Sequence, residues 1–206
     1  MALVLDKFYY RRGYKIIVGT DEAGRGCMLG PVVAGAVILP EDFSCDLIND
    51  SKQLNEKQRE EAYKIIIDNA IAYGIGQCSP QEIDQMNILN ASREAMMRAI
   101  NQIEVKYDLI LTDAMKLQIN TPWEAIIHGD AKSQSIAAAS ILAKVTRDHI
   151  CYELDKQYPG YGIAQHKGYL TSEHQQILEE KGIIKEIYRL TYKPIKKYLV
   201  EKVSLF

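Results

Sequence analysis

The sequence predicts an α/β fold in which helices cover both faces of a central sheet. Two observations lead to this prediction. Short apolar runs typical of buried strands alternate with longer segments of helical periodicity. After the last of these runs, helix-like segments dominate, so helices concentrate in the C-terminal third. At 206 residues, without an internal repeat or a linker rich in Pro, Gly and Ser, the chain is expected to form one domain.

In chain order, the first half is expected to form three strands and two helices. The first helix has Asn55 as its N-cap, with Gln58 placed to reach back to it in a capping box. The second helix carries alanines and isoleucines along one face at helical spacing. The first two strands enclose a glycine-rich turn. The expected strands cover residues 15–19, 31–40 and 71–78, and the expected helices cover 55–70 and 87–103.

The second half is expected to form two more strands and then only helices. Its first strand, YDLILTD, is continuously apolar, as in a parallel strand that is buried on both faces. Gly182 is placed to end one of the helices. Within the single domain 1–206, residues from about 171 to 206 are expected to form a C-terminal helical extension. The expected strands cover 107–113 and 122–130, and the helices cover about 131–156, 171–181 and 192–206.

Composition indicates an ordinary globular protein of the cytoplasm. The formal net charge of −2 indicates no overall attraction to a polyanion, so a nucleic-acid partner would need a local basic stripe or bridging metal ions. The four cysteines are widely spaced and are expected to be free thiols in a reducing compartment. The N-terminal residues do not resemble a secretory signal, and no apolar run reaches the length of a membrane helix.

Carboxylates follow three of the expected strands, at the point where each strand ends. Asp21 and Glu22 follow the first strand, Asp113 the fourth and Asp130 the fifth. Sites in open α/β sheets gather at the carboxyl ends of strands, so these acids converge if the first and fourth strands are parallel neighbours. Clustered carboxylates repel one another, and Mg²⁺ or Mn²⁺, which prefer oxygen ligands, compensate that charge. The sequence therefore predicts a divalent-metal site there.

Each acid also has a purely structural interpretation. Asp21 and Glu22 suit a turn before a glycine, Asp113 suits a solvated strand end, and Asp130 suits the N-cap of the next helix. Two features favour a site over these alternatives. The acids recur at the same kind of position, and glycines at 24 and 26 let backbone approach a ligand closely.

Four segments together resemble the signatures of the ribonuclease HII family. They are DEAGRGCMLGPVVAGAV, DSKQL, GDAKSQSIAAASILAKVTRD and YPGYGIAQHKGYLTSEH, they occur in that family's order, and they span nearly all of residues 16 to 174. The related ribonuclease HIII family has a large N-terminal extension and a different residue after the first motif glycine. Here GRG is intact and the first strand begins near residue 15, which favours ribonuclease HII.

The resemblance implies a ribonuclease H-like fold, with a mixed central sheet flanked by helices and a helical C-terminal region. It implies an endoribonuclease that hydrolyses the RNA strand of RNA–DNA hybrids and cuts at ribonucleotides embedded in duplex DNA. Two divalent ions, Mn²⁺ or Mg²⁺, would act in catalysis and leave 5′-phosphate and 3′-hydroxyl ends. The enzyme is expected to be a monomer.

The resemblance also implies roles for individual residues. The segment of Gly24, Arg25 and Gly26 recognises the ribose 2′-hydroxyl, and Tyr169 stacks on the sugar at the RNA–DNA junction. Near the C-terminus, Tyr188 stands where the family usually has histidine, followed by Arg189 as in the family. The four metal-binding and catalytic acids are Asp21, Glu22, Asp113 and Asp130, and the substrate-binding residues are Gly24, Arg25, Gly26, Lys52, Asn87 and Tyr169.

The chain ends in a segment that suggests a protein partner. Val203, Ser204, Leu205 and Phe206 resemble the short motif by which repair and replication proteins dock on the sliding clamp, with lysine in place of its usual glutamine. The alternative is that the last two side chains fold back onto the preceding helix. A further set of cations suits phosphate contacts: Lys132, Lys144, Arg147 and Lys167. For Lys144 and Arg147, a solvated helix surface is an equal alternative.

Two other functions are compatible with the fold. One is a different metal nuclease, such as a resolvase or integrase, although those enzymes lack GRG joined to HKGY. The other is a nucleic-acid-binding module without catalysis, whose sequence would be expected to have lost an acid. All four acids are present here.

Overall fold

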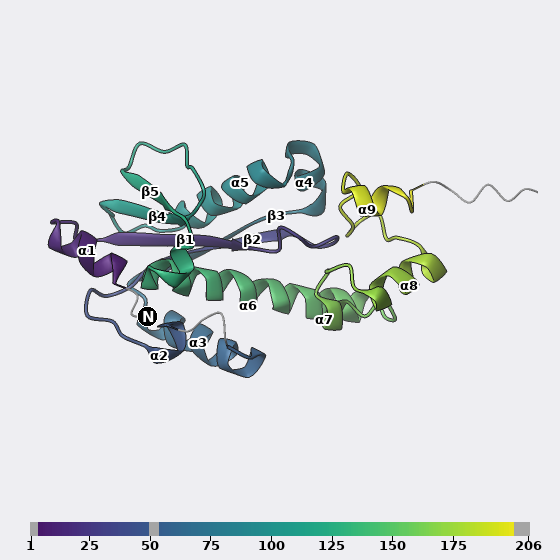
Figure 1. The fold of residues 1–206 in the computed structure, drawn as a ribbon, viewed down its shortest axis with the longest axis horizontal. Helices are drawn as coiled ribbons and strands as arrows, with labels where there is room; N and C mark the ends of the chain where they lie inside the picture. The colour runs from purple at the N-terminus through teal and green to yellow at the C-terminus, as the bar shows by residue number, and fades with distance from the viewer. Residues whose placement is uncertain (1–3, 50–53, 200–206) are drawn as a thin grey trace, which may run out of the picture.

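The computed structural model describes residues 4–49 and 54–199. A five-stranded mixed sheet with strand order β3-β2-β1-β4-β5 forms its centre (Figure 1). β1 runs antiparallel to β2 and parallel to β4, so the condition for convergence of the acids, a parallel pairing of the first and fourth strands, is met. The strands are β1 (Ile17–Ala23), β2 (Val32–Ile38), β3 (Ala72–Cys78), β4 (Leu109–Asp113) and β5 (Trp123–Ile126).

Helices cover both faces of this sheet, as the sequence predicts. α6 lies along one face with α3, and α5 lies along the other (Figure 1). Glycines in the strands allow this close packing, because a Cβ on Gly35 would come within 2.5 Å of the Ala139 carbonyl oxygen. The helices in the N-terminal half are α1 (Leu5–Arg11), α2 (Asp46–Asn49), α3 (Glu56–Asn69), α4 (Pro80–Met86) and α5 (Ile88–Ile100).

The C-terminal elements gather at one end of the molecule, around the end of α6 (Figure 1). They enclose an apolar cluster of their own, which includes Leu29, Cys151, Leu178 and Tyr188. The carboxylate of Asp84 joins this region to α4 by accepting hydrogen bonds from the backbone amides of residues 190 and 191. The elements of the second half are η1 (Gly129–Ala131), α6 (Gln134–Gln157), α7 (Ile163–His166), α8 (Ser172–Lys181) and α9 (Lys193–Lys196).

Several expected boundaries were wrong. β1 continues to Ala23, because its ladder with β2 extends to the pair Ala23 and Val33, so Asp21 and Glu22 lie inside the strand. Asp130 lies in the short helix η1, and α6 starts only at Gln134, where the Ser133 hydroxyl caps it. The helix expected over 192–206 is a single turn within the described part, and its last seven residues lie outside it.

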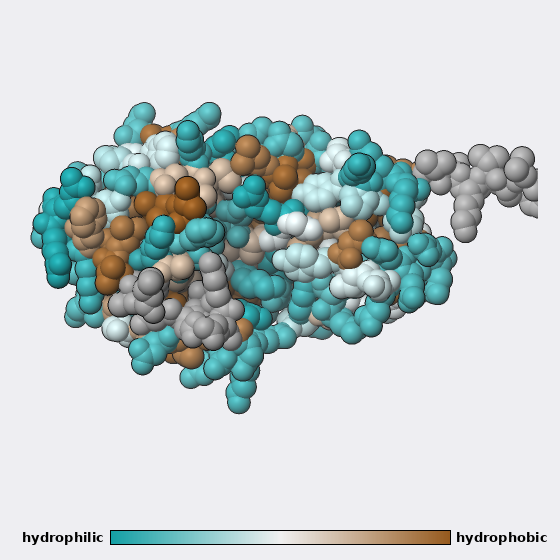
Figure 2. All heavy atoms as spheres, in the orientation of Figure 1, coloured by the Kyte–Doolittle hydropathy of each residue, from teal (hydrophilic) through white to brown (hydrophobic). Residues whose placement is uncertain are grey.

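On the face of the molecule that Figure 2 shows, apolar side chains form separate small patches among hydrophilic ones. Within the described residues, no helix has both the length and the apolar character needed to cross a membrane. The four cysteines are free thiols, as the sequence predicts.

Candidate active site

The sheet brings three of the four predicted acids to one edge. The register of β1 and β4 pairs Thr20 with Thr112, so Asp21 and Asp113 follow at the same level on adjacent strands. Glu22 comes next on β1. The carboxylate of Asp113 accepts a 2.8 Å hydrogen bond from the backbone amide of Gly129, which draws the turn that carries Asp130 to this edge.

Burial and the neighbouring carboxylates make the charged forms of Asp21 and Glu22 costly. The pKa of Asp21 lies well above its ordinary value, chiefly because of burial and then because of the charges of Glu22 and Asp113. Burial also raises the pKa of Glu22, and the nearby Arg25 guanidinium opposes that rise. Arg25 Nη1 lies 3.1 Å from Glu22 Oε1. The other carboxylate oxygen, Oε2, is buried and accepts no hydrogen bond within the described part of the chain.

The donor set fits a hard divalent cation. The residues at this edge offer carboxylate oxygens, which Mg²⁺ and Mn²⁺ prefer. The buried Oε2 of Glu22 is an oxygen atom whose desolvation a bound cation would compensate. Among residues 4–49 and 54–199, no three His, Cys, Asp or Glu side chains stand close enough together to hold a metal ion. The acids are therefore grouped at one edge of the sheet, but their side chains are not close enough together to coordinate one metal ion.

The glycine-rich loop faces the predicted sugar-stacking residue. A Cβ on Gly26 would have only the ring of Tyr169 within 4 Å, at 3.9 Å. Gly26 is exposed, and 49% of Tyr169 is exposed. Two motifs far apart in the sequence thus meet at one surface. Gly24 is constrained differently: its φ is +97°, and a Cβ there would come within 2.1 Å of Arg147 Nε.

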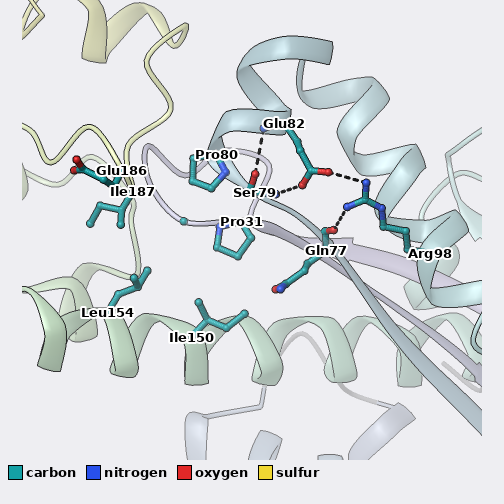
Figure 3. A pocket seen from close by; sticks show the side chains of 11 residues that line it. Pro31, Gln77, Ser79, Pro80, Glu82, Arg98, Ile150, Leu154, Glu186 and Ile187 are labelled. Atoms are coloured by element: carbon teal, nitrogen blue, oxygen red, sulfur yellow. Dashed lines mark hydrogen bonds and ion pairs between the residues drawn. The ribbon is translucent and has the colours of Figure 1, made fainter.

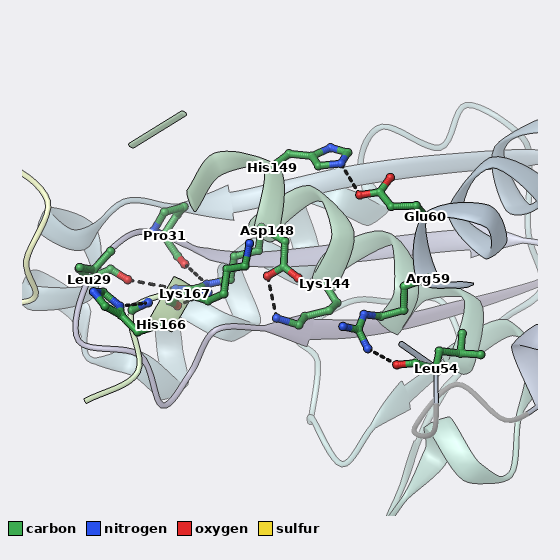
Figure 4. Close-up of polar contacts among 12 residues, drawn as sticks. Leu29, Pro31, Leu54, Arg59, Glu60, Lys144, Asp148, His149, His166 and Lys167 are labelled. Carbon is green, nitrogen blue, oxygen red and sulfur yellow. Dashed lines mark hydrogen bonds and ion pairs between the residues drawn. The ribbon is translucent and has the colours of Figure 1, made fainter. Parts of the chain in front are cut away.

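A buried arginine joins the two loops. Arg147 on α6 is only 1% exposed. Its Nη1 donates to the carbonyl oxygen of Lys167 at 2.9 Å, and its Nη2 and Nε donate to the carbonyl oxygens of Leu29 and Pro31 at 3.1 and 3.2 Å. Figure 4 shows these carbonyl-bearing residues gathered beside α6. Arg147 therefore lies neither at a phosphate-facing surface nor on a solvated helix face. Its guanidinium N–H groups donate instead to buried backbone carbonyl oxygens of the protein.

The other cations proposed to face phosphates also have intramolecular contacts. Lys144 Nζ lies 2.6 Å from Asp148 Oδ1 (Figure 4). Lys132 Nζ donates to the Ile127 carbonyl oxygen at 2.7 Å. Lys167 Nζ lies 3.3 Å from the centre of the Tyr152 ring. A phosphate would have to compete with these contacts.

Of the two other predicted substrate residues, one caps a helix and one lies outside the described part. Asn87 is exposed and caps α5, where its Oδ1 accepts from the Asn90 amide at 3.1 Å. Its φ of +68° and ψ of 162° are unusual for a residue other than glycine. Lys52 and residues 203–206 lie outside the described residues.

Sequence reasoning missed two supports of the site. Asp6 on α1 is buried and accepts from the Ser133 hydroxyl at 2.6 Å and from the Ser135 amide at 2.9 Å, which fixes the start of α6 just after Asp130. Arg189 is fully buried and donates to the carbonyl oxygens of Gly30 and Arg25 at 3.0 and 3.1 Å. Charged side chains are usually exposed, and no local sequence pattern indicated that Asp6 or Arg189 would be buried.

A cavity of about 460 Å³ lies behind the glycine-rich loop (Figure 3). Pro31, Pro80, Ile150 and Leu154 contribute apolar walls, and none of the four predicted acids lines it. Its Arg98 is already bound to Glu82 at 2.7 Å and to Glu94 at 2.9 Å. The cavity is thus separate from the acidic edge.

Comparisons with known proteins agree with this architecture. A family described as "Ribonuclease HII" matches residues 18–195. A protein named ribonuclease HII from Acetivibrio thermocellus is 50% identical over 190 residues, which is 92% of this chain and 74% of that protein. The crystal structure of ribonuclease H2 from Pyrococcus horikoshii aligns with a TM-score of 0.76 at 28% identity, over 89% of this chain and 96% of that one. The structure of a PCNA:RNase HII complex from Archaeoglobus fulgidus aligns with a TM-score of 0.72 at 25% identity, over 86% and 95%.

Proposed function

This chain belongs to the ribonuclease HII family, and from that premise we propose that Asp21, Glu22, Asp113 and Asp130 hold the divalent ions of its active site. The chain is a metal-dependent endonuclease that hydrolyses the RNA strand of RNA–DNA hybrids and cuts at ribonucleotides embedded in DNA. Family membership decides against a resolvase, an integrase or a module without catalysis.

The buried carboxylates at the sheet edge support the metal assignment. Asp21 and Glu22 are desolvated, and one Glu22 oxygen accepts no hydrogen bond from the described residues. Carboxylates so placed are costly unless a cation neutralises them. When bound, Mg²⁺ or Mn²⁺ supplies Lewis acidity to the attacking water and the departing 3′-oxygen. Asp113 and Asp130 complete the ligand set from the neighbouring strand and turn.

The surface between Gly26 and Tyr169 supports a site for ribose. The 2′-hydroxyl is the group that distinguishes RNA from DNA at a given position. Backbone groups of the Gly24-Arg25-Gly26 loop can reach that hydroxyl because Gly26 presents no side chain. The half-exposed ring of Tyr169 offers a stacking surface for the sugar at the junction. Lys52 and Asn87 are proposed as further substrate contacts.

Cleavage of defined duplexes tests this proposal. The protein is incubated with Mg²⁺ or Mn²⁺ and a DNA duplex that contains one ribonucleotide, beside an all-DNA duplex of the same sequence. We expect cutting of the first duplex alone, with 5′-phosphate and 3′-hydroxyl ends that a ligase can use on a matching template. Equal cutting of both duplexes, or cutting without divalent metal, would contradict the proposal.

A sliding clamp is the proposed protein partner. The structure of the RNase HII from Archaeoglobus fulgidus is that of a complex with PCNA. In this chain the C-terminal Val203, Ser204, Leu205 and Phe206 supply an apolar pair suited to a groove on such a clamp. Deleting the last two residues should abolish binding to the cognate clamp and leave cleavage of free duplex unchanged. Clamp binding that survives the deletion would end this assignment.

We further propose that the enzyme acts as a monomer in the cytoplasm, where its cysteines stay reduced.

A further inference from the structure

A directional chain of hydrogen bonds lies behind the loop that carries Tyr169. The Tyr188 hydroxyl lies 2.8 Å from His174 Nε2, and His174 Nδ1 lies 2.8 Å from the carbonyl oxygen of Tyr169. Tyr188 and His174 are both fully buried, whereas the ring of Tyr169 reaches the surface beside Gly26. The chain therefore connects the C-terminal region to the backbone of a residue at the site.

Hydrogen-bond chemistry fixes the direction of this chain. A carbonyl oxygen can only accept, so His174 Nδ1 carries the proton that it donates to Tyr169. In the neutral ring, Nε2 then holds a lone pair and accepts from the Tyr188 hydroxyl. The opposite tautomer would place a lone pair against the Tyr169 carbonyl oxygen. The Tyr169 carbonyl oxygen thus selects this tautomer, and the Tyr188 hydroxyl stabilises it by donating to the lone pair on Nε2.

A second histidine holds the same loop from the other side. The ring of His166 stacks on that of His174, with centroids 3.8 Å apart and planes 5° from parallel. Its Nδ1 accepts from the Gly168 amide at 2.9 Å, so its Nε2 donates to the Tyr161 carbonyl oxygen, also at 2.9 Å. In both neutral rings, each nitrogen atom therefore makes one hydrogen bond, one as donor and the other as acceptor.

The loop between these histidines needs such support. Lys167 and Gly168 have φ of +50° and +83°, and for the lysine this left-handed conformation is unfavourable. The Tyr169 backbone is fixed at both polar groups: its amide donates to the His166 carbonyl at 2.9 Å, and its carbonyl also accepts from the Thr171 amide at 3.0 Å. Of these contacts, only those of the histidines depend on side chains whose tautomer can change.

We propose that Tyr188 and His174 are positioning residues for Tyr169: by donating to Nε2, the Tyr188 hydroxyl stabilises the His174 tautomer that donates to Tyr169, and His174 in turn fixes the backbone from which the Tyr169 ring meets the sugar. This inference rests on the proposed role of Tyr169 in substrate binding. A simple packing role for Tyr188 would require its ring and not its hydroxyl, so the two roles separate in Tyr188→Phe.

A double-mutant cycle tests the inference on the full chain with Mg²⁺. The substrate is a DNA duplex that contains one ribonucleotide. Tyr188→Phe should lower kcat/KM by about 5- to 20-fold, since it leaves a buried histidine nitrogen without its donor. In a Tyr169→Ala background the same change should cost less than about two-fold, because the ring that it positions is gone. Tyr158→Phe, which removes a hydroxyl from a half-buried tyrosine against the same apolar cluster, should leave kcat/KM unchanged.

The outcomes separate this inference from the proposed function. If Tyr169→Ala leaves cleavage unchanged, the role of Tyr169 fails and the inference fails with it. If Tyr169→Ala slows cleavage and Tyr188→Phe does not, the inference alone is overturned. Equal losses from Tyr188→Phe in both backgrounds would show a general effect and would also overturn it.

A spectroscopic measurement on the wild-type protein tests the inference even if the variants fail to fold. In ¹⁵N-histidine-labelled wild-type protein, the His174 ring should show a protonated Nδ1 and an unprotonated Nε2 at neutral pH. In Tyr188→Phe, that pattern should weaken or give way to the other tautomer. A wild-type ring protonated on Nε2 alone would overturn the inference.

Discussion

The carboxylate of Asp113 accepts a hydrogen bond of 2.8 Å from the backbone amide of Gly129. This contact joins the end of β4 to the turn that precedes the next acid in the chain, Asp130. Because β4 is also paired in parallel with β1, the end of β4 connects the positions of all four acids. One oxygen atom of Asp113, Oδ1, thus supports the turn, and we propose that its carboxylate also serves as a metal ligand.

We expect Asp113→Asn to lower the cleavage rate at least about 100-fold, because a metal-assisted step loses several kcal/mol when a charged ligand becomes neutral. The amide oxygen can still accept from Gly129, so the fold and the binding of an RNA–DNA hybrid should survive. Single-turnover cleavage and fluorescence anisotropy measure the two effects. The matched control is Asp42→Asn, at an exposed aspartate beyond the opposite end of β1. Full activity of Asp113→Asn with Mg²⁺ would refute the metal assignment.

Divalent metal should stabilise the fold by relieving repulsion among the acids. At about 100 times its Kd, a ligand specific to the native state adds about 2.7 kcal/mol to the free energy of unfolding. For a chain of this size that corresponds to a rise in Tm of about 5–10 °C. Thermal denaturation in EDTA and in Mn²⁺ or Mg²⁺ measures the shift, and Asp113→Asn should reduce it. An unchanged Tm at millimolar metal would count against a metal site at this edge.

Local patterns in the sequence predicted most of the sheet and its helices. The capping box of Asn55 and Gln58 is present as expected, because it depends only on neighbouring residues. The helix α4 was missed although its signal was local too: Ser79 caps it, Pro80 begins it and Glu82 completes a second capping box.

The parts of the site that could not be predicted depend on contacts between distant segments. The length of β1 follows from its ladder with β2, which no single strand reveals. Arg147 is buried because its partners are carbonyl groups of two loops, 20 to 118 residues away in the sequence. Its charge suggested a phosphate contact, and only the three-dimensional structure supplies the alternative.

The two glycines of the GRG loop should respond differently to alanine. Gly24→Ala should lower the free energy of unfolding by at least about 2 kcal/mol, because φ is +97° and the new Cβ collides with Arg147. Gly26→Ala should cost less than about 1 kcal/mol, since its Cβ meets only the Tyr169 ring at 3.9 Å. Its cleavage at a single ribonucleotide should nevertheless fall at least about 10-fold, because the methyl group blocks the sugar. Urea denaturation and kinetics test the pair. Unimpaired cleavage by a stable Gly26→Ala would contradict the proposed ribose site.

The last prediction concerns pH and the buried His174. Burial lowers the pKa of His174 to about 4 from its ordinary 6.5; its hydrogen bond to Tyr169 opposes this shift, and the neighbouring His166 adds to it. The pKa of His166 is lowered as well, chiefly by burial, while Asp155 and Glu173 oppose that effect. Tyr188 faces the other side of His174 as a neutral donor.

Between pH 6.5 and 4, the unfolded chain binds a proton at His174 that the folded chain does not bind, because the pKa is lowered in the folded state. Stability contributed by the neutral ring is present above pH 6.5 and declines as the pH falls towards 4.

Replacement by asparagine isolates this contribution. His174→Asn removes the titrating group and keeps an amide nitrogen at the position of Nδ1, from which it can donate to the Tyr169 carbonyl. Urea denaturation of both proteins in EDTA, between about pH 4.5 and 7.5, gives the difference in their free energies of unfolding. The acids of the metal site titrate in both proteins, so their effect cancels in that difference. We expect the wild-type advantage at neutral pH to shrink by on the order of 2 kcal/mol across this window. Parallel stability curves would show that His174 is not held neutral, and the tautomer that fixes Tyr169 would then lose its basis.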